Sequence, residues 1–396
     1  MKDTRMTPFN HGLIWFGAAI SIAEILTGAL LAPLGFKKAL LAIVLGHLIG
    51  GGLMYLAGLI GARTQRSAME TVKMSFGEKG GLLFASLNIM QLVGWTAVMI
   101  AAGAAAANSI FPTDSAIWAV GLGVLIIIWI FVGIGNIAKL SLVTMAALFA
   151  LSLLMSKIIF ASGSVQTLAT GGMSFGSAVE LSVIMPLSWL PLISDYTRSA
   201  TQKPRLVTFT GVAVYFFASC WMYAIGVAAA IFTGKSDVAE IMTVAGFGIA
   251  AVLVVVASTV TTTFLDVYSA GVSAVSLTKK LNEKHVAIVA CLAGTALAIF
   301  TPVSKFESFL YLIGSVFAPM IAVMIVDAFI LKRNHASQRF SITGLAVWAV
   351  GFISYRYLMH AGFETVVGLT VPVMILTAGV ALLVAFITNH SGQQAA

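Results

Sequence analysis

Long apolar stretches separated by short polar loops make up nearly the whole chain. Each stretch is long enough to cross a bilayer as an α-helix. The pattern predicts an all-α integral membrane protein with one transmembrane domain over residues 1–396. We expect twelve spans, at about 12–34, 39–62, 81–111, 116–135, 140–161, 177–197, 206–233, 241–276, 286–301, 307–331, 341–360 and 365–388.

Two of these spans are interrupted near their middle. Span 1 contains Gly17, Gly28 and Pro33, and span 6 contains Pro186 and Pro191. Proline removes a backbone donor and clashes with the preceding turn, so we expect the middle of span 6 to be kinked or unwound. Bare backbone at membrane depth is tolerated only where it is buried in protein or lines a cavity.

The two interrupted spans occupy matching places in the chain. Each is the first member of a set of five spans, 12–161 and 177–331, and two additional helices follow at 341–388. Broken helices at corresponding positions of two halves are typical of transporters built from inverted repeats. The sequence therefore predicts a transporter of this kind.

Composition and charge support a membrane location. The chain is 60% hydrophobic and 9% charged, whereas a soluble domain carries about 25% charged residues. Of its 22 Lys and Arg residues, 16 lie in the N-terminal tail and the even-numbered loops and 5 in the opposite loops. This bias predicts that both termini are cytoplasmic and that the protein lies in the cell inner (plasma) membrane. The net charge of +8 therefore reflects topology, and we expect a lipid bilayer as partner, no nucleic acid and no obligate protein partner.

Glu24 lies near the middle of span 1, among small residues. A carboxylate at this depth costs about 3 kcal/mol even on lenient insertion scales, so it is a candidate functional residue. The small neighbours leave room for another backbone or a ligand. The alternative is a buried acid that pairs with another helix for structural reasons.

Gln91 and Trp95 of span 3 are four residues apart and share one helix face. A tryptophan beside an amide suits a flat heteroaromatic ligand, because the ring can stack and the amide can bond to an edge. The alternative is an ordinary packing tryptophan, one of seven in the chain.

Ser258, Thr261 and Thr262 of span 8 stand on one helix face. Hydroxyl and carbonyl oxygens are the ligands of hard cations, and an unwound part of span 1 could add free carbonyls. The alternative is that these hydroxyls bond back to carbonyls of their own helix. Asp266, about one turn further along, is a second intramembrane acid, whose role is open between an ion path and pairing with a basic residue.

The chain resembles the nucleobase–cation symporter family, which contains cytosine, allantoin and hydantoin permeases. The resemblance is strongest at residues 91–95 (QLVGW), 195–198 (DYTR), and Thr261-Thr262 followed by residues 268–271 (YSAG). It implies a LeuT-type fold of five-plus-five inverted repeats with two additional helices. Residues 21–28 (SIAEILTG) and 186–192 (PLSWLPL) are most similar to the group proposed to import hydroxymethylpyrimidine, the thiamin precursor.

The resemblance also implies two sites. Its sodium site would use the carbonyls of Gly17, Ile20 and Ser258 and the hydroxyls of Thr261 and Thr262. Its substrate site would use an aromatic residue of span 3, matching Trp95, and one of span 6, together with Ser21 and Ser188. Counting back from Asp195 places the span 6 aromatic residue at Pro186, so Trp189 takes this role only through a shift of about one turn.

Glu24 departs from the cytosine permease pattern, which has a small polar residue at this position. A carboxyl group can pair with the ring nitrogen and the exocyclic amine of a 4-aminopyrimidine as a two-pronged contact. We therefore expect a Na⁺-coupled importer of hydroxymethylpyrimidine, with a substrate site of Ser21, Glu24, Gln91, Trp95, Ser188 and Trp189, and no enzymatic activity. The alternative is a cytosine or purine permease coupled to H⁺ through Glu24.

Overall fold

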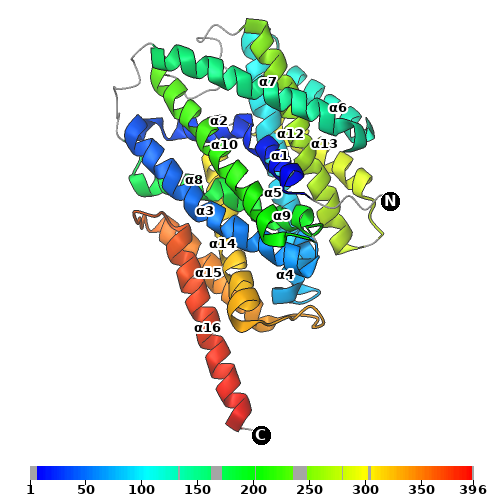
Figure 1. Ribbon diagram of the computed structural model, residues 1–396, viewed down its shortest axis with the longest axis vertical. Coiled ribbons are helices and arrows are strands. Elements are labelled where there is room, and N and C mark those ends of the chain that lie inside the picture. Colours follow the sequence, from blue (N-terminus) through cyan, green and yellow to red (C-terminus); the bar gives the residue numbers. More distant parts are fainter. Residues whose placement is uncertain are drawn as a thin grey trace.

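The computed structural model describes residues 7–132, 134–161, 172–200, 202–234, 248–278, 280–301 and 305–394, and all regular secondary structure in these ranges is helical. Figure 1 shows the helices packed as a bundle, with α1 and α2 inside it. The first half contains α1 (Pro8–Ala19), α2 (Ile22–Leu30), η1 (Ala32–Leu34), α3 (Phe36–Thr64), α4 (Ala68–Phe76), α5 (Gly80–Ile110), α6 (Ser115–Val132) and α7 (Ile134–Ala161). The second half contains α8 (Phe175–Ser188), α9 (Leu190–Thr197), α10 (Pro204–Thr233), α12 (Gly248–Leu277), α13 (Glu283–Phe300), α14 (Phe306–Ile325), η4 (Val326–Leu331), α15 (Ile342–His360) and α16 (Thr370–Gln394).

These helices confirm an all-α membrane protein. Within the ranges given above, nine helices are long and apolar enough to cross a membrane, and the bent pair Pro8–Ala19 and Ile22–Leu34 would make a tenth span. Shorter apolar helices, Ser115–Phe131 and Leu142–Lys157, occupy the places of predicted spans 4 and 5. The exact number of twelve spans stays a prediction.

Glycines let the central helices approach closely. A Cβ atom at Gly46 or Gly50 of α3 would lie 2.7 Å and 2.9 Å from backbone oxygens of α8. A Cβ atom at Gly28 of α2 would lie 2.2 Å from the carbonyl oxygen of Tyr223, and one at Gly226 of α10 would lie 2.1 Å from that of Ile25. Small residues at such crossings replace side-chain packing with backbone contact, which is common between membrane helices. The two broken spans are therefore each fixed against a continuous helix.

Glu180, a buried residue of α8, joins the broken span 6 to the last two helices. Its carboxylate accepts hydrogen bonds from the backbone N–H groups of Leu369 and Thr370, both at 2.8 Å, and from the hydroxyls of Thr370 and Tyr355. These N–H groups open α16, where an anion satisfies donors that have no partner within the helix. Figure 1 shows α16 beside α15 and extending away from the rest of the bundle toward the C-terminus.

The short helix α4 was not predicted, although the chain contains its start signal. Ser67 and Glu70 form a capping box. Burial alone would raise the pKa of Glu70, but hydrogen bonds from Ser67 and the charges of Arg198 and Arg66 bring that pKa below its ordinary value. Asp195, at the end of α9, accepts a hydrogen bond from Ala68 N at 2.9 Å.

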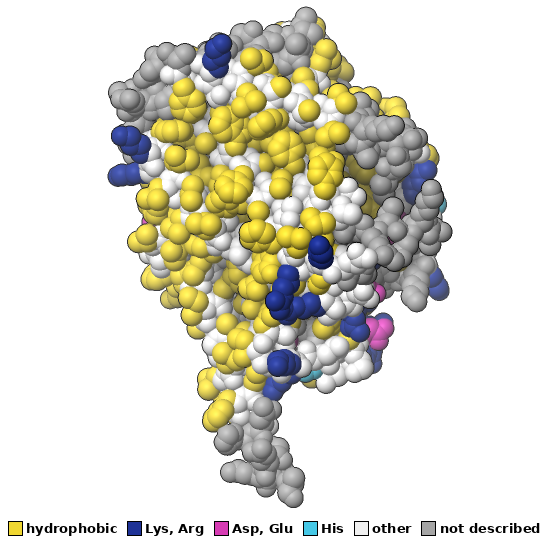
Figure 2. Space-filling model, in the orientation of Figure 1, with side chains coloured by type: hydrophobic (Ala, Val, Ile, Leu, Met, Phe, Trp, Pro, Cys, Tyr) yellow, Lys and Arg dark blue, Asp and Glu magenta, His cyan; other side chains and the backbone are white. Residues whose placement is uncertain are grey.

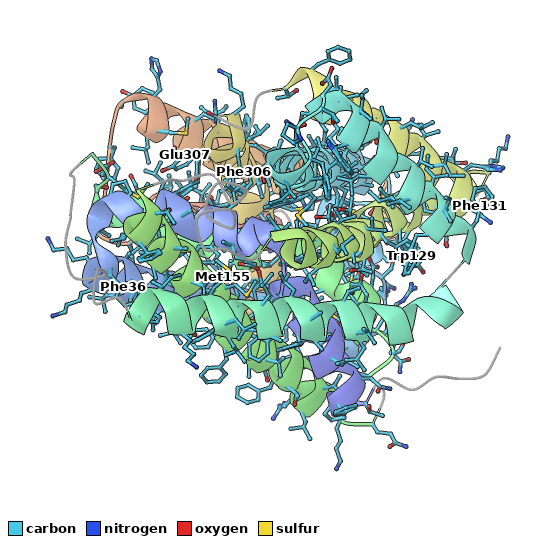
Figure 3. The ribbon with its side chains drawn as sticks, turned by 90° about the horizontal axis from the view of Figure 1, so that it is seen from above. Phe36, Trp129, Phe131, Met155, Phe306 and Glu307 are labelled. Carbon is cyan, nitrogen blue, oxygen red and sulfur yellow. The ribbon has the colours of Figure 1, made fainter. Side chains whose placement is uncertain are left out.

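The outer face of the bundle is apolar. Figure 2 shows hydrophobic side chains over most of the visible face, with Lys and Arg mainly toward its edges and lower part. Well-exposed apolar side chains in the described part of the chain include Leu41, Leu48, Phe209 and Phe217. Figure 3 shows α7, which carries Met155, lying across the bundle, with Phe36 of α3 near one of its ends. The ring centroids of Phe36 and Phe160 are 5.6 Å apart. An exposed apolar surface of this extent suits contact with lipid.

Candidate functional site at the two helix breaks

The first helix break lies at Ile20 and Ser21, between α1 and α2, which are bent by 53°. In a continuous helix the N–H of Ser21 would bond to the carbonyl of Gly17, but here it bonds to Ala19 O at 3.0 Å. The Gly17 carbonyl therefore loses its helical partner. Ser21 is extended and buried, and its hydroxyl makes no capping hydrogen bond.

The second break lies at Trp189, between α8 and α9. Here the N–H of Leu192 bonds to Trp189 O at 3.0 Å instead of the carbonyl of Ser188. Pro186 and Pro191 flank the break, as the sequence predicted. Each broken span thus releases backbone carbonyls from the helical pattern, including that of Gly17 in the first and that of Ser188 in the second.

Gln91 of α5 satisfies the carbonyl released at the second break. Its Nε2 donates to Ser188 O at 2.8 Å and lies 3.1 Å from Asn88 Oδ1. The other amide atom, Oε1, is buried and has no hydrogen-bond partner. The hydroxyl of Ser188 donates to Met185 O at 2.7 Å within its own helix. The site therefore presents a buried amide oxygen that is open to a donor.

The two tryptophans expected to flank a ligand face different neighbours. Trp95, which is buried, packs edge-on against Phe306 and Phe309 of α14, with ring centroids 5.8 Å and 5.5 Å away. Figure 3 shows Phe306 near the middle of the view, at the start of α14. Trp189 is partly buried and packs edge-on against Trp15 of α1 at 5.5 Å. Its Nε1 donates to the hydroxyl of Tyr215 at 3.2 Å.

Glu24 is buried, and both of its carboxyl oxygens are engaged by α10. Tyr215 Oη lies 2.8 Å from Oε1, and Ser219 Oγ lies 2.7 Å from Oε2. Ser219 Oγ also lies 2.6 Å from Nε2 of His47 on α3. A direct contact between Glu24 and a ligand stays a prediction, and a ligand donor would use a second lone pair of a carboxyl oxygen or replace one of these hydroxyls.

Sequence reasoning missed Tyr215 and Ser219 as partners of Glu24, and His47 as the further partner of Ser219. The available signal was the spacing of Tyr215 and Ser219, four residues apart on one face of an apolar helix. The spacing does not say which helix that face meets. Only the packing of α2 and α3 against α10 brings the four side chains together.

The hydroxyl cluster of α12 lies next to α7. Thr261 Oγ1 contacts the carbonyls of Ser258 at 3.0 Å and Ala257 at 3.1 Å, and it lies 3.3 Å from Thr144 Oγ1 of α7. Back-bonding to the helix, one of the two alternatives, is therefore present for Thr261. The hydroxyl of Ser258 is buried without a partner, and Thr262 is 7% exposed.

α7 also brings this cluster close to the first break. A Cβ atom at Gly17 would lie 2.1 Å from Sδ of Met145, the residue that follows Thr144. Gly17 and Thr261 therefore contact adjacent residues of one helix, and α2 packs against α12 as well. The described part of the chain has no group of three or more His, Cys, Asp or Glu that could hold a metal. A cation here would be bound by neutral oxygens, which suits a hard monovalent ion.

Comparisons with known proteins extend over nearly the whole chain. The profile of the family described as "Permease for cytosine/purines, uracil, thiamine, allantoin" matches residues 2–393. The cytosine permease of Escherichia coli (strain K12) is 24% identical over 358 residues, covering 86% of this chain and 81% of that protein.

Two solved structures share the fold. Mhp1, a nucleobase-cation-symport-1 family transporter in a closed conformation with bromovinylhydantoin bound, has a TM-score of 0.78 at 21% identity, covering 96% of this chain and 93% of that one. A Na⁺-coupled sialic acid symporter in a substrate-bound outward-open state has a TM-score of 0.71 at 15% identity, covering 97% and 89%. At these identities the likeness establishes the fold.

Proposed function

This chain belongs to the nucleobase–cation symporter family, the permeases for cytosine/purines, uracil, thiamine and allantoin, and from this premise we propose that it imports hydroxymethylpyrimidine together with Na⁺. The protein is a membrane transporter and not an enzyme. The substrate and the coupling ion are the proposal. The substrate would dock at the two helix breaks, and import would proceed by alternating access.

The observation that carries the substrate class is the free amide oxygen of Gln91. It is buried beside the second break without a donor, and an unsatisfied buried acceptor costs about 1–3 kcal/mol. The exocyclic amine of a 4-aminopyrimidine could donate the hydrogen bond that this oxygen lacks. The hydroxyl of Ser21 and the lone pairs of Ser188 could bind further polar atoms of the ring substituents.

The aromatic residues support a flat ligand. Trp95 lies nearly perpendicular to Phe306 and Phe309, and Trp189 to Trp15, and in the proposed complex the two indole rings would stack on the ligand. Cytosine and hydroxymethylpyrimidine both carry a 4-amino group, so the geometry supports 4-aminopyrimidines as a class and does not distinguish between these two. The likeness of residues 21–28 and 186–192 to the hydroxymethylpyrimidine group favours that member.

We propose that Na⁺ binds between the first break and α12. Its ligands would be the carbonyls of Gly17, Ile20 and Ser258 and the hydroxyls of Thr261 and Thr262. The released Gly17 carbonyl and the shared contact of Gly17 and Thr261 with α7 support this site. Bound Na⁺ would hold α1 against α12, so ion and substrate would favour the same state and each would tighten the other's binding by one common factor.

The architecture proposed from the sequence fits this function. Residues 12–161 and 177–331 would form the two inverted repeats of a single transmembrane domain, with 341–388 as additional helices. The matching breaks in α1–α2 and α8–α9 support this division. We also propose that the protein lies in the inner (plasma) membrane with both termini cytoplasmic, as the Lys and Arg distribution indicates.

The first experiment measures equilibrium binding of hydroxymethylpyrimidine and of cytosine to the purified protein, in Na⁺ and then in choline. We expect the hydroxymethylpyrimidine to bind more tightly, and its affinity to fall when choline replaces Na⁺. Preference for cytosine would overturn the substrate assignment, and equal affinity in both salts would overturn Na⁺ coupling. Glucose, which is neither flat nor aromatic, serves as the negative control.

The second candidate is a cytosine or purine permease coupled to H⁺ through Glu24. It is favoured by the similarity to the Escherichia coli cytosine permease and by the burial of Glu24 within the membrane region. The same measurement distinguishes it, because it predicts cytosine or purine binding that is indifferent to Na⁺ and sensitive to pH.

A further inference from the structure

Five side chains, from Trp189 at the second break to His47 on α3, form one continuous chain of hydrogen bonds. It runs from Trp189 Nε1 to Tyr215 Oη at 3.2 Å, and from there to Glu24 Oε1 at 2.8 Å. From Glu24 Oε2 it continues to Ser219 Oγ at 2.7 Å and then to His47 Nε2 at 2.6 Å. It ends where His47 Nδ1 lies 2.9 Å from the carbonyl oxygen of Ile43.

Each contact in this chain of hydrogen bonds needs one hydrogen. A carbonyl oxygen can only accept, so His47 Nδ1 carries a hydrogen, and in a neutral ring Nε2 is then an acceptor. Two contacts meet at Ser219 Oγ, one to Nε2 and one to Glu24 Oε2, and each needs one hydrogen. The hydroxyl of Ser219 supplies one. The second must be a titratable proton, held on Glu24 or on His47.

We propose that Glu24, Ser219 and His47 form a proton-binding site that holds one exchangeable proton and joins α2, α3 and α10. With the proton on Glu24, every donor points the same way along the chain: Trp189 to Tyr215, Tyr215 to Glu24, Glu24 to Ser219, Ser219 to His47, and His47 to Ile43. This arrangement places no charge inside the membrane, whereas moving the proton to His47 creates a buried ion pair, which is costly to desolvate. The proton therefore rests on Glu24.

Loss of this proton breaks the chain. Glu24 is then a carboxylate and His47 is neutral, and only one hydrogen remains for the two contacts at Ser219. One of them becomes an unfavourable contact between two acceptors, and the helices that carry them must separate there. Deprotonation thus weakens the contact among α2, α3 and α10.

Besides Tyr215, the ionisable groups nearest to Glu24 in the described part of the chain are Cys220 and Tyr223 on α10. The ring of Tyr223 packs edge-on against His47 at 4.8 Å. His11 of α1 is engaged by Val207 O and Trp15, and Glu180 of α8 is engaged by α16. Asp266 is the buried acid of α12. Within the described residues, the side-chain and backbone groups that act on Glu24 and His47 are Tyr215, Ser219 and the carbonyl of Ile43.

The proton site is connected to the proposed substrate site through Tyr215 and Trp189. Because loss of the proton weakens the contact of α10 with α2 and α3, it also loosens Tyr215 of α10, and Tyr215 holds Trp189 at the break of span 6. Protonation and substrate binding should therefore favour the same state and strengthen each other equally. This coupling rests on the proposed function, whereas the proton site stands on the contacts alone.

The site itself is tested without any substrate, by infrared spectroscopy of the purified full-length protein over a range of pH. We expect a carboxylic acid C=O band that disappears as pH rises and that is missing in Glu24→Gln. Asp266→Asn, which removes a buried acid that is not part of the hydrogen-bonded chain, should keep this band. His47→Phe keeps the ring packed on Tyr223 and removes the acceptor, so Ser219 can donate to an ionised Glu24. In that variant the band should disappear at lower pH.

The coupling is tested by binding of radiolabelled hydroxymethylpyrimidine and cytosine at several pH values. Above the pH at which the band disappears, we expect wild-type affinity for whichever base binds to fall by about tenfold per pH unit, as loss of one proton requires. The Glu24→Gln amide can accept from Tyr215 and donate to Ser219 but carries no titratable proton, so the affinity that this variant retains should not change with pH. Asp266→Asn should retain the wild-type pH dependence.

The outcomes separate the two proposals. A wild-type spectrum without the Glu24-dependent band, or a His47→Phe band unchanged in pH response, would overturn the proton site. Wild-type affinity that stays constant across the pH at which the band disappears would overturn the coupling. If the band behaves as expected and neither base binds at any pH, the proton site stands and the proposed substrate class fails.

Discussion

At the scale of single residues, the sequence showed which helix positions are polar but not which groups those side chains contact. Gln91 and Ser188 were both expected at the substrate site, and the structure joins them directly through the released Ser188 carbonyl. For Thr261, the sequence left cation binding and helix back-bonding as alternatives. The contact with Ser258 O shows that back-bonding is present, and the same oxygen still has a lone pair for an ion.

The hydroxyls of the proposed Na⁺ site can be tested one at a time. We expect Thr261→Val or Thr262→Val to raise the Na⁺ concentration needed for half-maximal substrate binding by about tenfold, because each loses one oxygen ligand of about 1.5 kcal/mol or more. Ser258→Ala is the matched control, since only the Ser258 carbonyl is a proposed ligand. Equal Na⁺ dependence in all three variants and the wild type would remove this cluster from the ion site.

At the scale of elements, broken helices create both the site and its supports. Each break releases a carbonyl from the regular pattern, and the structure either satisfies it from another helix, as Gln91 does, or leaves it for a ligand. Glu180 shows the same principle at a helix start, where one carboxylate satisfies two N–H groups of α16. The amphipathic α4 was missed because span-length apolar runs were the signal sought, and α4 is only 9 residues long.

Removal of the Glu180 charge should detach α16 from α8. We expect Glu180→Gln to lower the free energy of unfolding by about 2–3 kcal/mol, since hydrogen bonds to a charged group are lost and an N–H donor of the amide replaces an acceptor. Thermal unfolding in detergent, followed by the exposure of Cys220 and Cys291 to a thiol reagent, measures the loss.

Ser177→Ala is the control for this variant, because it removes an exposed hydrogen bond from the same helix to Glu364. It should change stability by no more than about 0.5 kcal/mol. If Glu180→Gln were as stable as Ser177→Ala, the carboxylate would not be the anchor of α16.

At the scale of the whole molecule, charge and hydropathy together predict orientation. The exposed apolar face indicates contact with lipid. The excess of Lys and Arg in alternate loops indicates which loops stay in the cytoplasm. Figure 2 shows basic side chains at more than one edge of the visible face. The orientation therefore rests on the loop count in the sequence.

Reporter fusions test this orientation in cells. A green fluorescent protein joined to either terminus should fluoresce, because both termini are predicted to be cytoplasmic. Alkaline phosphatase inserted at Gly362, in the loop between α15 and α16, should be active, since that loop is predicted to face outward. Activity of phosphatase at the C-terminus would reverse the predicted orientation.

The sequence by itself determined the membrane class, the helical fold, the two breaks and the family. These follow from run length, from the backbone chemistry of proline and glycine, and from motifs that are local in the chain. It also identified Gln91, Glu24 and Thr261 as unusual, because a polar group in an apolar run is visible without knowledge of its neighbours. Only the tertiary structure decided what each polar group contacts. Glu24 meets Tyr215 and Ser219, 191 and 195 residues away, and such a pairing depends on which helix faces meet, which hydrophobic periodicity cannot specify when nearly every face is apolar.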